Sequence, residues 1–196
     1  MGGSEWIHCL ANVGQGVGDS YPVTHVSWYD VVKWCNARSE KEGKTPVYKN
    51  GAAVYRTGNV YEPALVASAN GYRLPSEKEW EFAARGGTQT NGYTYSGSND
   101  LSAVGWYGGK YGGNSGKAVK EVGKKLANEL GIYDMSGNLW EWSGSWYPGN
   151  EGWGRVIRGG VWRYGAGYCT VADRNGHVNP GYRTNYGFRV ALSSVP

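Results

Sequence analysis

The chain has 196 residues, including 33 glycines, 10 tryptophans, 16 tyrosines and only two phenylalanines and three cysteines, and its formal net charge is +4. This length suits one domain with a buried core, and the many aromatic residues exclude a disordered chain. No apolar run approaches the ~20 residues of a membrane-spanning helix, and a mild charge with scattered Lys and Arg does not favour nucleic acid as a partner.

The beginning of the chain is expected to differ from the rest. Residues 1–21 are interpreted as an N-terminal segment, of which Met1-Gly2-Gly3-Ser4 resembles a cloning remnant, and residues 22–196 as the single domain. No charged and then apolar signal sequence opens the chain, which leaves the compartment undecided.

Two helices are predicted from their starting patterns. Ser27-Trp28-Tyr29-Asp30 resembles a capping box and is followed by an apolar run that ends at Gly43. Ser76-Glu77-Lys78-Glu79 is a second capping box, and its helix should end at Gly86-Gly87. Cys35, within the first helix, is expected to be a small buried hydrophobic residue.

Short strands are predicted between and after these helices. Two of them, 46–48 and 53–55, flank the turn Asn50-Gly51. Four more follow residue 130, at 131–133, 139–142, 155–158 and 187–191. Residues 86–130 are rich in Gly, Ser and Asn and are expected to form a long ordered loop region. The sequence therefore predicts one α+β domain, with two helices packed on a small antiparallel sheet and much irregular backbone.

Patterns typical of catalytic and metal sites are scarce in this sequence. It has no G-x-S-x-G elbow and no C-x-x-C pair, and its three histidines lack metal-ligand spacing. Cys9 and Cys169 could form a disulfide, but their spacing does not require one.

Four sequence blocks, in order along the chain, resemble the signature blocks of one protein family. They are GYRLPSEKEWEFAARGG at 71–87, GIYDMSGNLWEW at 131–142, RVIRGGVW at 155–162 and GFRV at 187–190. They resemble the formylglycine-generating enzyme (sulfatase-modifying factor) family, and the resemblance covers residues 22–191. It implies a C-type-lectin-like fold of the formylglycine-generating-enzyme type.

The resemblance does not extend to the oxidative chemistry of that family. Its oxidases carry a cysteine pair that works with copper and oxygen, whereas residues 163–169 here contain Cys169 alone. Its iron-dependent sulfoxide synthases need several histidines, which are also missing. We therefore predict a protein that is not an enzyme, and a family enzyme with an unrecognised site is the alternative.

Residues 155–190 resemble a narrower group, the variable proteins of diversity-generating retroelements, such as the Treponema variable protein. In that group fixed frame residues alternate with residues whose codons are randomised at adenines. The frame is kept here by Val156, Gly159, Gly160, Trp162, Ala166, Cys169, Val171, Ala172, Arg174, Pro180, Arg183, Gly187, Phe188 and Arg189.

The residues between these frame positions fit such randomisation. Each is reachable from an AAC codon by changing adenines only, and residues 163–186 contain no Lys, Glu, Gln, Met or Trp. Val161, where the family has Ser, is predicted to vary as well. The predicted ligand-binding residues are Val161, Arg163, Tyr164, Gly165, Tyr168, Asp173, Gly176, His177, Gly181, Tyr182, Thr184 and Tyr186.

The composition of this set resembles an antibody paratope, with rigid amphipathic rings beside small adaptable residues. We predict a receptor or display protein that binds an unidentified protein or other surface ligand through residues 161–186. The predicted location is the cell surface or the extracellular space, with a phage virion or the cytoplasm left open. The alternatives are ordinary half-buried tyrosines, or a structural or chaperone-like subunit with a large apolar interface elsewhere.

This function requires no cofactor, but the resemblance implies a calcium site in the G-N-L-W-E block. Asn138 and Glu141 are its candidate ligands, because oxygen atoms in a loop suit Ca²⁺. The same block is also explained by core packing of Trp140 and Trp142. Lectin-type glycan binding is not predicted, since Glu62-Pro63-Ala64 lacks the last residue of an E-P-N triplet.

Overall fold

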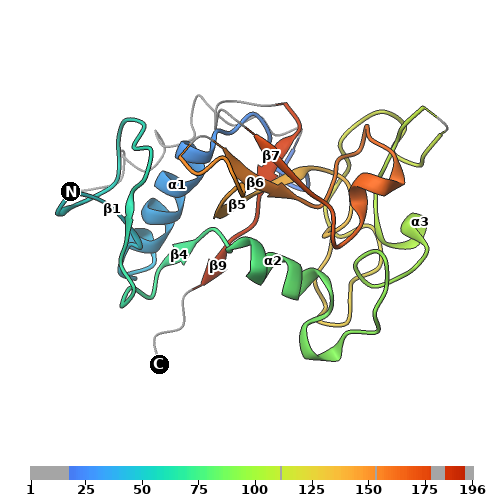
Figure 1. The fold of residues 1–196 in the computed structure, drawn as a ribbon, viewed down its shortest axis with the longest axis horizontal. Coiled ribbons are helices and arrows are strands. Elements are labelled where there is room, and N and C mark those ends of the chain that lie inside the picture. The colour runs from blue at the N-terminus through green and yellow to red at the C-terminus, as the bar shows by residue number, and fades with distance from the viewer. Residues whose placement is uncertain (1–17, 111, 153, 178–183, 193–196) are drawn as a thin grey trace.

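The computed structural model describes residues 18–110, 112–152, 154–177 and 184–192 (Figure 1). Its helices are α1 (Trp28–Lys41), α2 (Glu77–Ala84) and α3 (Leu101–Val104), with 3₁₀ turns at Gly87–Gln89 and Ala166–Cys169. Its strands are β1 (Tyr48–Asn50), β2 (Ala53–Val54), β3 (Ala64–Leu65), β4 (Tyr72–Arg73), β5 (Trp140–Trp146), β6 (Arg155–Arg158), β7 (Arg174–His177), β8 (Tyr186–Phe188) and β9 (Ala191–Leu192). None of the helices in these ranges is long and apolar enough to cross a membrane.

Both predicted helices begin at their capping boxes. The Ser27 side chain accepts the N–H of Asp30 at 3.1 Å, and the Asp30 carboxylate accepts the N–H of Ser27 at 3.0 Å. Ser76 and Glu79 make the same exchange at the start of α2, at 3.3 and 2.8 Å. Each box satisfies N–H groups that have no partner within the helix. Cys35 is fully buried in α1, as predicted.

The strands form three small sheets. Their orders are β2-β1-β3, β4-β9 and β7-β6-β5-β8. In the four-stranded sheet β5 is antiparallel to β6 but parallel to β8, so the purely antiparallel arrangement that we predicted is wrong. A parallel pair needs a long crossover, and the whole segment 147–185 lies between these two strands.

The last predicted strand, 187–191, is divided between two sheets. Its first part belongs to β8, which pairs with β5, and its end belongs to β9, which pairs with β4. Between them the Arg189 side chain binds the Glu141 carboxylate on β5. The prediction of one strand was wrong because two different partners compete for this segment.

The described part of segment 86–130 is mostly irregular, as predicted, apart from the short helix α3 and the 3₁₀ turn at Gly87–Gln89. Asn128 holds part of this segment together. The Asn128 amide donates to the carbonyl of Ala83 at 2.7 Å and to the hydroxyl of Ser96 at 3.0 Å. Its oxygen accepts the N–H groups of Leu130 and Ile132. The N–H of Gly131 also donates to the Asn128 carbonyl, which closes a turn over residues 128–131, and the strand predicted at 131–133 is absent.

The two longer helices pack on opposite faces of the four-stranded sheet, and α2 runs beneath it in Figure 1. On the α1 face, Trp142 and Ile157 belong to the larger core cluster together with residues of α1. On the α2 face, the Trp80 indole donates to Glu141 at 2.6 Å and Arg158 binds Glu81. Successive side chains along a strand point to opposite faces of the sheet, so neighbouring residues contact different helices.

Candidate functional site

A hollow of about 370 Å³ lies where the chain after β6 meets β7, β8 and the start of β5. The lining residues are Trp140, Arg163, Tyr164, His177, Thr184, Asn185 and Tyr186. Among the predicted ligand-binding residues, the structure therefore brings five together here: Arg163, Tyr164, His177, Thr184 and Tyr186.

The floor of the hollow is a cluster of aromatic rings. Tyr186 pairs in register with Trp140 on β5, which places both on the α1 face of the sheet. The Tyr186 ring lies 5.1 Å from the Trp142 ring at 87° and 5.5 Å from the His177 ring at 74°. Such edge-to-face contacts are favourable, and Trp142 is fully buried. The floor is therefore held rigidly by the core.

The rim of the hollow carries a positioned arginine. With its amide oxygen turned toward Arg163, Asn185 accepts from Nη1 at 3.1 Å and from Nε at 3.2 Å. Nη2 of Arg163 donates to the Tyr164 hydroxyl at 3.4 Å. The Tyr164 ring lies 5.2 Å from the ring of Tyr168, which is 48% exposed.

Tyr168 thus extends the surface beyond the hollow. We call the predicted ligand-binding residues in and beside the hollow the aromatic surface. They are Arg163, Tyr164, Tyr168, His177, Thr184 and Tyr186.

The loop that carries the rim is held through its backbone. The N–H of Gly108 donates to the carbonyl of Tyr164 at 2.9 Å. A Cβ on Gly108 would lie 2.6 Å from the Trp162 carbonyl oxygen, and one on Gly109 would lie 3.0 Å from Gly165 Cα. Gly165 itself has no atom within 4 Å of its Cβ direction and a φ of −68°, so this predicted position accepts other side chains.

Two predicted ligand-binding residues do not belong to this surface. Val161 is fully buried in the larger core cluster, so its side chain cannot contact a ligand. Gly176 lies on the opposite face of β7 from its neighbour His177, and a Cβ there would be 2.5 Å from the Tyr147 ring. Both predictions are therefore wrong. The predicted residues Gly181 and Tyr182 lie outside the described part of the chain.

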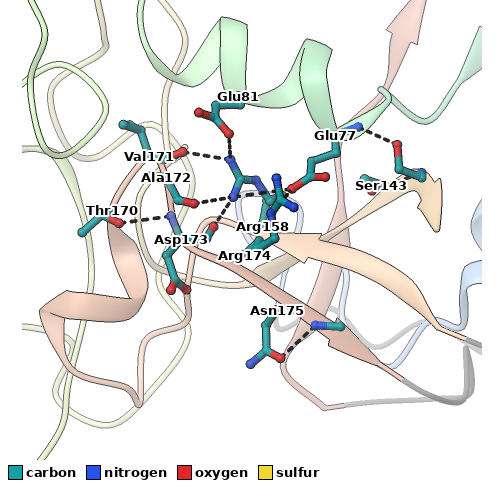
Figure 2. Close-up of polar contacts among 12 residues, drawn as sticks. Glu77, Glu81, Ser143, Arg158, Thr170, Val171, Ala172, Asp173, Arg174 and Asn175 are labelled. Atoms are coloured by element: carbon teal, nitrogen blue, oxygen red, sulfur yellow. Dashed lines mark hydrogen bonds and ion pairs between the residues drawn. The ribbon is translucent and has the colours of Figure 1, made fainter. Parts of the chain in front are cut away.

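Asp173 also lies away from the hollow, in a segment that Arg158 anchors (Figure 2). The fully buried guanidinium of Arg158 donates to the backbone oxygens of Val171 at 2.9 Å, Ala172 at 3.0 Å and Asp173, and pairs with Glu81 at 2.5 Å. These acceptors are backbone atoms, which substitutions do not change. The anchor therefore holds the segment whichever side chain occupies position 173.

Two residues of the hollow were not predicted. The codon pattern could have predicted Asn185, because an unchanged AAC codon encodes Asn. Trp140 belongs to the G-N-L-W-E-W block and was assigned to core packing alone. It is 2% exposed, yet it lines the floor. No sequence signal separates these two roles.

The two candidate calcium ligands already have other partners. The Asn138 side chain accepts the N–H of Lys120 at 3.0 Å and donates to its carbonyl at 3.1 Å. The Glu141 carboxylate accepts from Arg189 at 2.5 and 2.6 Å and from Trp80 at 2.6 Å. As paired, these side chains do not fit a calcium ion, which needs oxygens free to coordinate it.

Cys169 has the surroundings of a structural thiol. It is fully buried, and burial raises its pKa to about 12. Its thiol therefore stays protonated at neutral pH, whereas the reactive and metal-binding form is the thiolate. In the described part of the chain, Cys169 is a free, buried thiol, and Cys35 is also buried.

Comparison with known proteins identifies the family that has this fold. Residues 3–194 match the sulfatase-modifying factor enzyme 1-like domain. The chain belongs to this family. It is 32% identical to the solved Treponema denticola variable protein 1, with a TM-score of 0.78 and coverage of 97% of this chain and 80% of that chain. The predicted C-type-lectin-like fold of the formylglycine-generating-enzyme type is thereby confirmed.

Two curated relatives show how function varies within the family. The chaperone protein LppX of Paenibacillus barcinonensis is 38% identical over 184 residues, which cover 81% of this chain and 65% of that protein. The inactive C-alpha-formylglycine-generating enzyme 2 of Bos taurus is 29% identical over 194 residues, which cover 92% and 54%. The chain thus spans less than two thirds of the length of these relatives.

Proposed function

We propose that the chain is a non-enzymatic ligand-binding protein, whose aromatic surface contacts the ligand and varies between copies of the gene. One observation carries this proposal: residues singled out by a codon pattern, separate in the sequence, converge on one hollow. The similarity to a protein named as variable supports it. Display at a cell surface stays a prediction.

Binding would rest on complementary shape and polar contacts. Tyrosine rings bring a large contact area and a hydroxyl while losing little conformational freedom. The rings of His177 and Tyr186 are fixed against the buried Trp142, so little order has to be created on binding. Tyr164, Tyr168 and Thr184 are exposed and free to be exchanged without disturbing the core.

A display library tests this proposal directly. Codons for the six residues of the aromatic surface are replaced by codons that end in C and are random at the first two positions, and the chain is displayed on yeast. Selection on several unrelated soluble proteins should yield specific binders for each. Replacement of the selected residues at the exposed positions 164, 168 and 184 by alanine should abolish binding while the melting temperature changes little. Folded libraries that never yield binders would overturn the proposal.

The enzymatic alternative makes a different prediction. A cysteine-containing substrate peptide, incubated with the chain, copper and oxygen, would lose its thiol, and Cys169→Ser would abolish that activity. We expect no thiol loss above the rate without protein, because Cys169 is buried and its thiol stays protonated.

A second candidate function rests on a groove outside residues 161–186, whose lining is mostly apolar but includes Arg73, Glu79 and Arg189. This groove of about 820 Å³ is lined in part by the exposed side chains of Leu65, Val190 and Leu192. Contiguous exposed apolar residues commonly mark contact sites, and one relative is named a chaperone. A chaperone function would require an unfolded apolar segment to bind here.

An aggregation assay separates the two functions. If the groove binds unfolded segments, the chain should suppress the heat-induced light scattering of an unrelated enzyme, and Leu65→Asp with Leu192→Asp should remove that effect. If the aromatic surface alone is functional, the chain should not suppress scattering at all.

A further inference from the structure

The aromatic surface carries positive charge that its own residues do not balance. Arg163 lines the hollow, and no lining residue is acidic. Residues 161–192 contain four arginines but only one carboxylate, that of Asp173. The Asp173 segment lies beside Arg158, on the α2 side of the sheet.

Most arginines of this segment that the structure describes are already paired. Arg174 contacts Glu77 at 2.8 Å, and Arg189 contacts Glu141 at 2.5 Å. Arg163, by contrast, makes no ion pair with any described residue and binds only the neutral groups of Asn185 and Tyr164. Its charge is therefore positioned but not compensated by any residue that the structure describes.

Such an arginine is suited to a carboxylate. The planar guanidinium binds carboxylates through two parallel hydrogen bonds, and these charge-assisted bonds are stronger than neutral ones. Because Asn185 already fixes the side chain, less rotamer entropy is lost when a partner arrives. A nucleic acid would require a row of cations along its backbone, whereas here a cation stands among rings typical of protein recognition.

We propose that the ligand of this variant is an acidic segment of a protein, which presents an Asp or Glu side chain to Arg163. The inference rests on the proposed function, because it names the ligand class of the same surface.

A peptide library provides the test. Random peptides displayed on phage are selected on the whole chain, and the selected pool should be enriched in Asp and Glu relative to the unselected library. Individual acidic peptides should bind Arg163→Gln about tenfold or more weakly, and Arg163→Lys should recover part of the loss. Arg174→Gln is the matched control and should leave binding unchanged, because Arg174 is already paired with Glu77.

Tyr164→Ala separates failure of this inference from failure of the proposed function. A neutral or basic pool whose binding Tyr164→Ala abolishes would keep the surface but overturn the acidic ligand. Acidic peptides insensitive to both Arg163→Gln and Tyr164→Ala would overturn both proposals. A library without enriched acidic binders, or an oligonucleotide that competes as well as an acidic peptide, would overturn the assignment of an acidic protein segment.

Discussion

Asp173 occupies the turn before β7, with its carboxyl oxygen Oδ2 buried and without a hydrogen-bond partner among the described residues. Burial raises the pKa of this carboxyl, and the nearby Arg158 offsets only part of that rise. The folded state therefore favours the neutral acid. The stability that the neutral Asp173 carboxyl contributes is fully present at low pH. It is lost as the pH rises from the ordinary carboxyl pKa through the raised pKa of Asp173 in the folded chain.

We therefore expect Asp173→Asn to raise the melting temperature near pH 7 by roughly 1–2 °C, since the group is partly solvated. Near pH 3, where the acid is already protonated, the variant and the parent should melt together. Thermal unfolding followed by circular dichroism at both pH values measures the difference. A lower melting temperature near pH 7, or the same gain at both pH values, would contradict this account of Asp173.

Cys169 offers a second test at the level of one residue. Its pKa of about 12 and full burial predict that iodoacetamide leaves it unmodified in the folded chain at neutral pH. Peptide mass spectrometry should find modified Cys169 only after unfolding in denaturant. Rapid modification of Cys169 in the folded chain would instead revive the enzymatic alternative.

At the scale of elements, Arg158 on β6 joins α2 to the segment that leads into β7. Replacement by Met would leave the Glu81 carboxylate and several backbone oxygens without their buried donor. Breaking a buried pair in this way costs about 3–5 kcal/mol, which predicts a fall in melting temperature of about 6 °C or more.

Arg163→Met provides the matched comparison for this prediction. Arg163 is exposed, so its replacement should change stability by no more than about 0.5 kcal/mol. Differential scanning calorimetry of both variants should show a large effect for Arg158 and a small one for Arg163. Similar losses in the two variants would contradict the separation of a fixed frame from an exchangeable surface.

Local signals predicted the helices of this fold better than its strands. The capping boxes at Ser27 and Ser76 involve residues three positions apart, so the sequence alone reveals them. The division of 187–191 between β8 and β9 depends on partners far away in the chain, on β5 and β4. The parallel pairing of β5 with β8 has the same origin.

The candidate site shows the same limit at residue level. The codon pattern predicted both Gly176 and His177, yet these neighbours lie on opposite faces of β7, because side chains alternate along a strand. Val161 also fitted the pattern but is fully buried in the larger core cluster, to which Trp142 and Ile157 also belong. A codon pattern states which residues vary under the hypothesis, and only the fold states which of them meet solvent.

In the whole molecule, the proposed binding surface lies on a rigid frame. No residue of α1 or α2 lines the hollow. The rim loop is held by backbone contacts with Gly108 and Gly109. Substitutions at the exposed residues Tyr164, Tyr168 and Thr184 therefore leave these backbone bonds intact. This arrangement is what a binding protein needs if its contact residues change from copy to copy.

Sequencing the DNA beside the gene tests this account most directly. The proposed function predicts a near-copy of codons 155–190 next to a reverse transcriptase gene, differing from the coding sequence only at adenines of the copy. The differences should fall at codons of the aromatic surface and spare those of Val161 and Gly176. The absence of such a copy, or differences spread over buried frame residues such as Ile157 and Arg158, would contradict it.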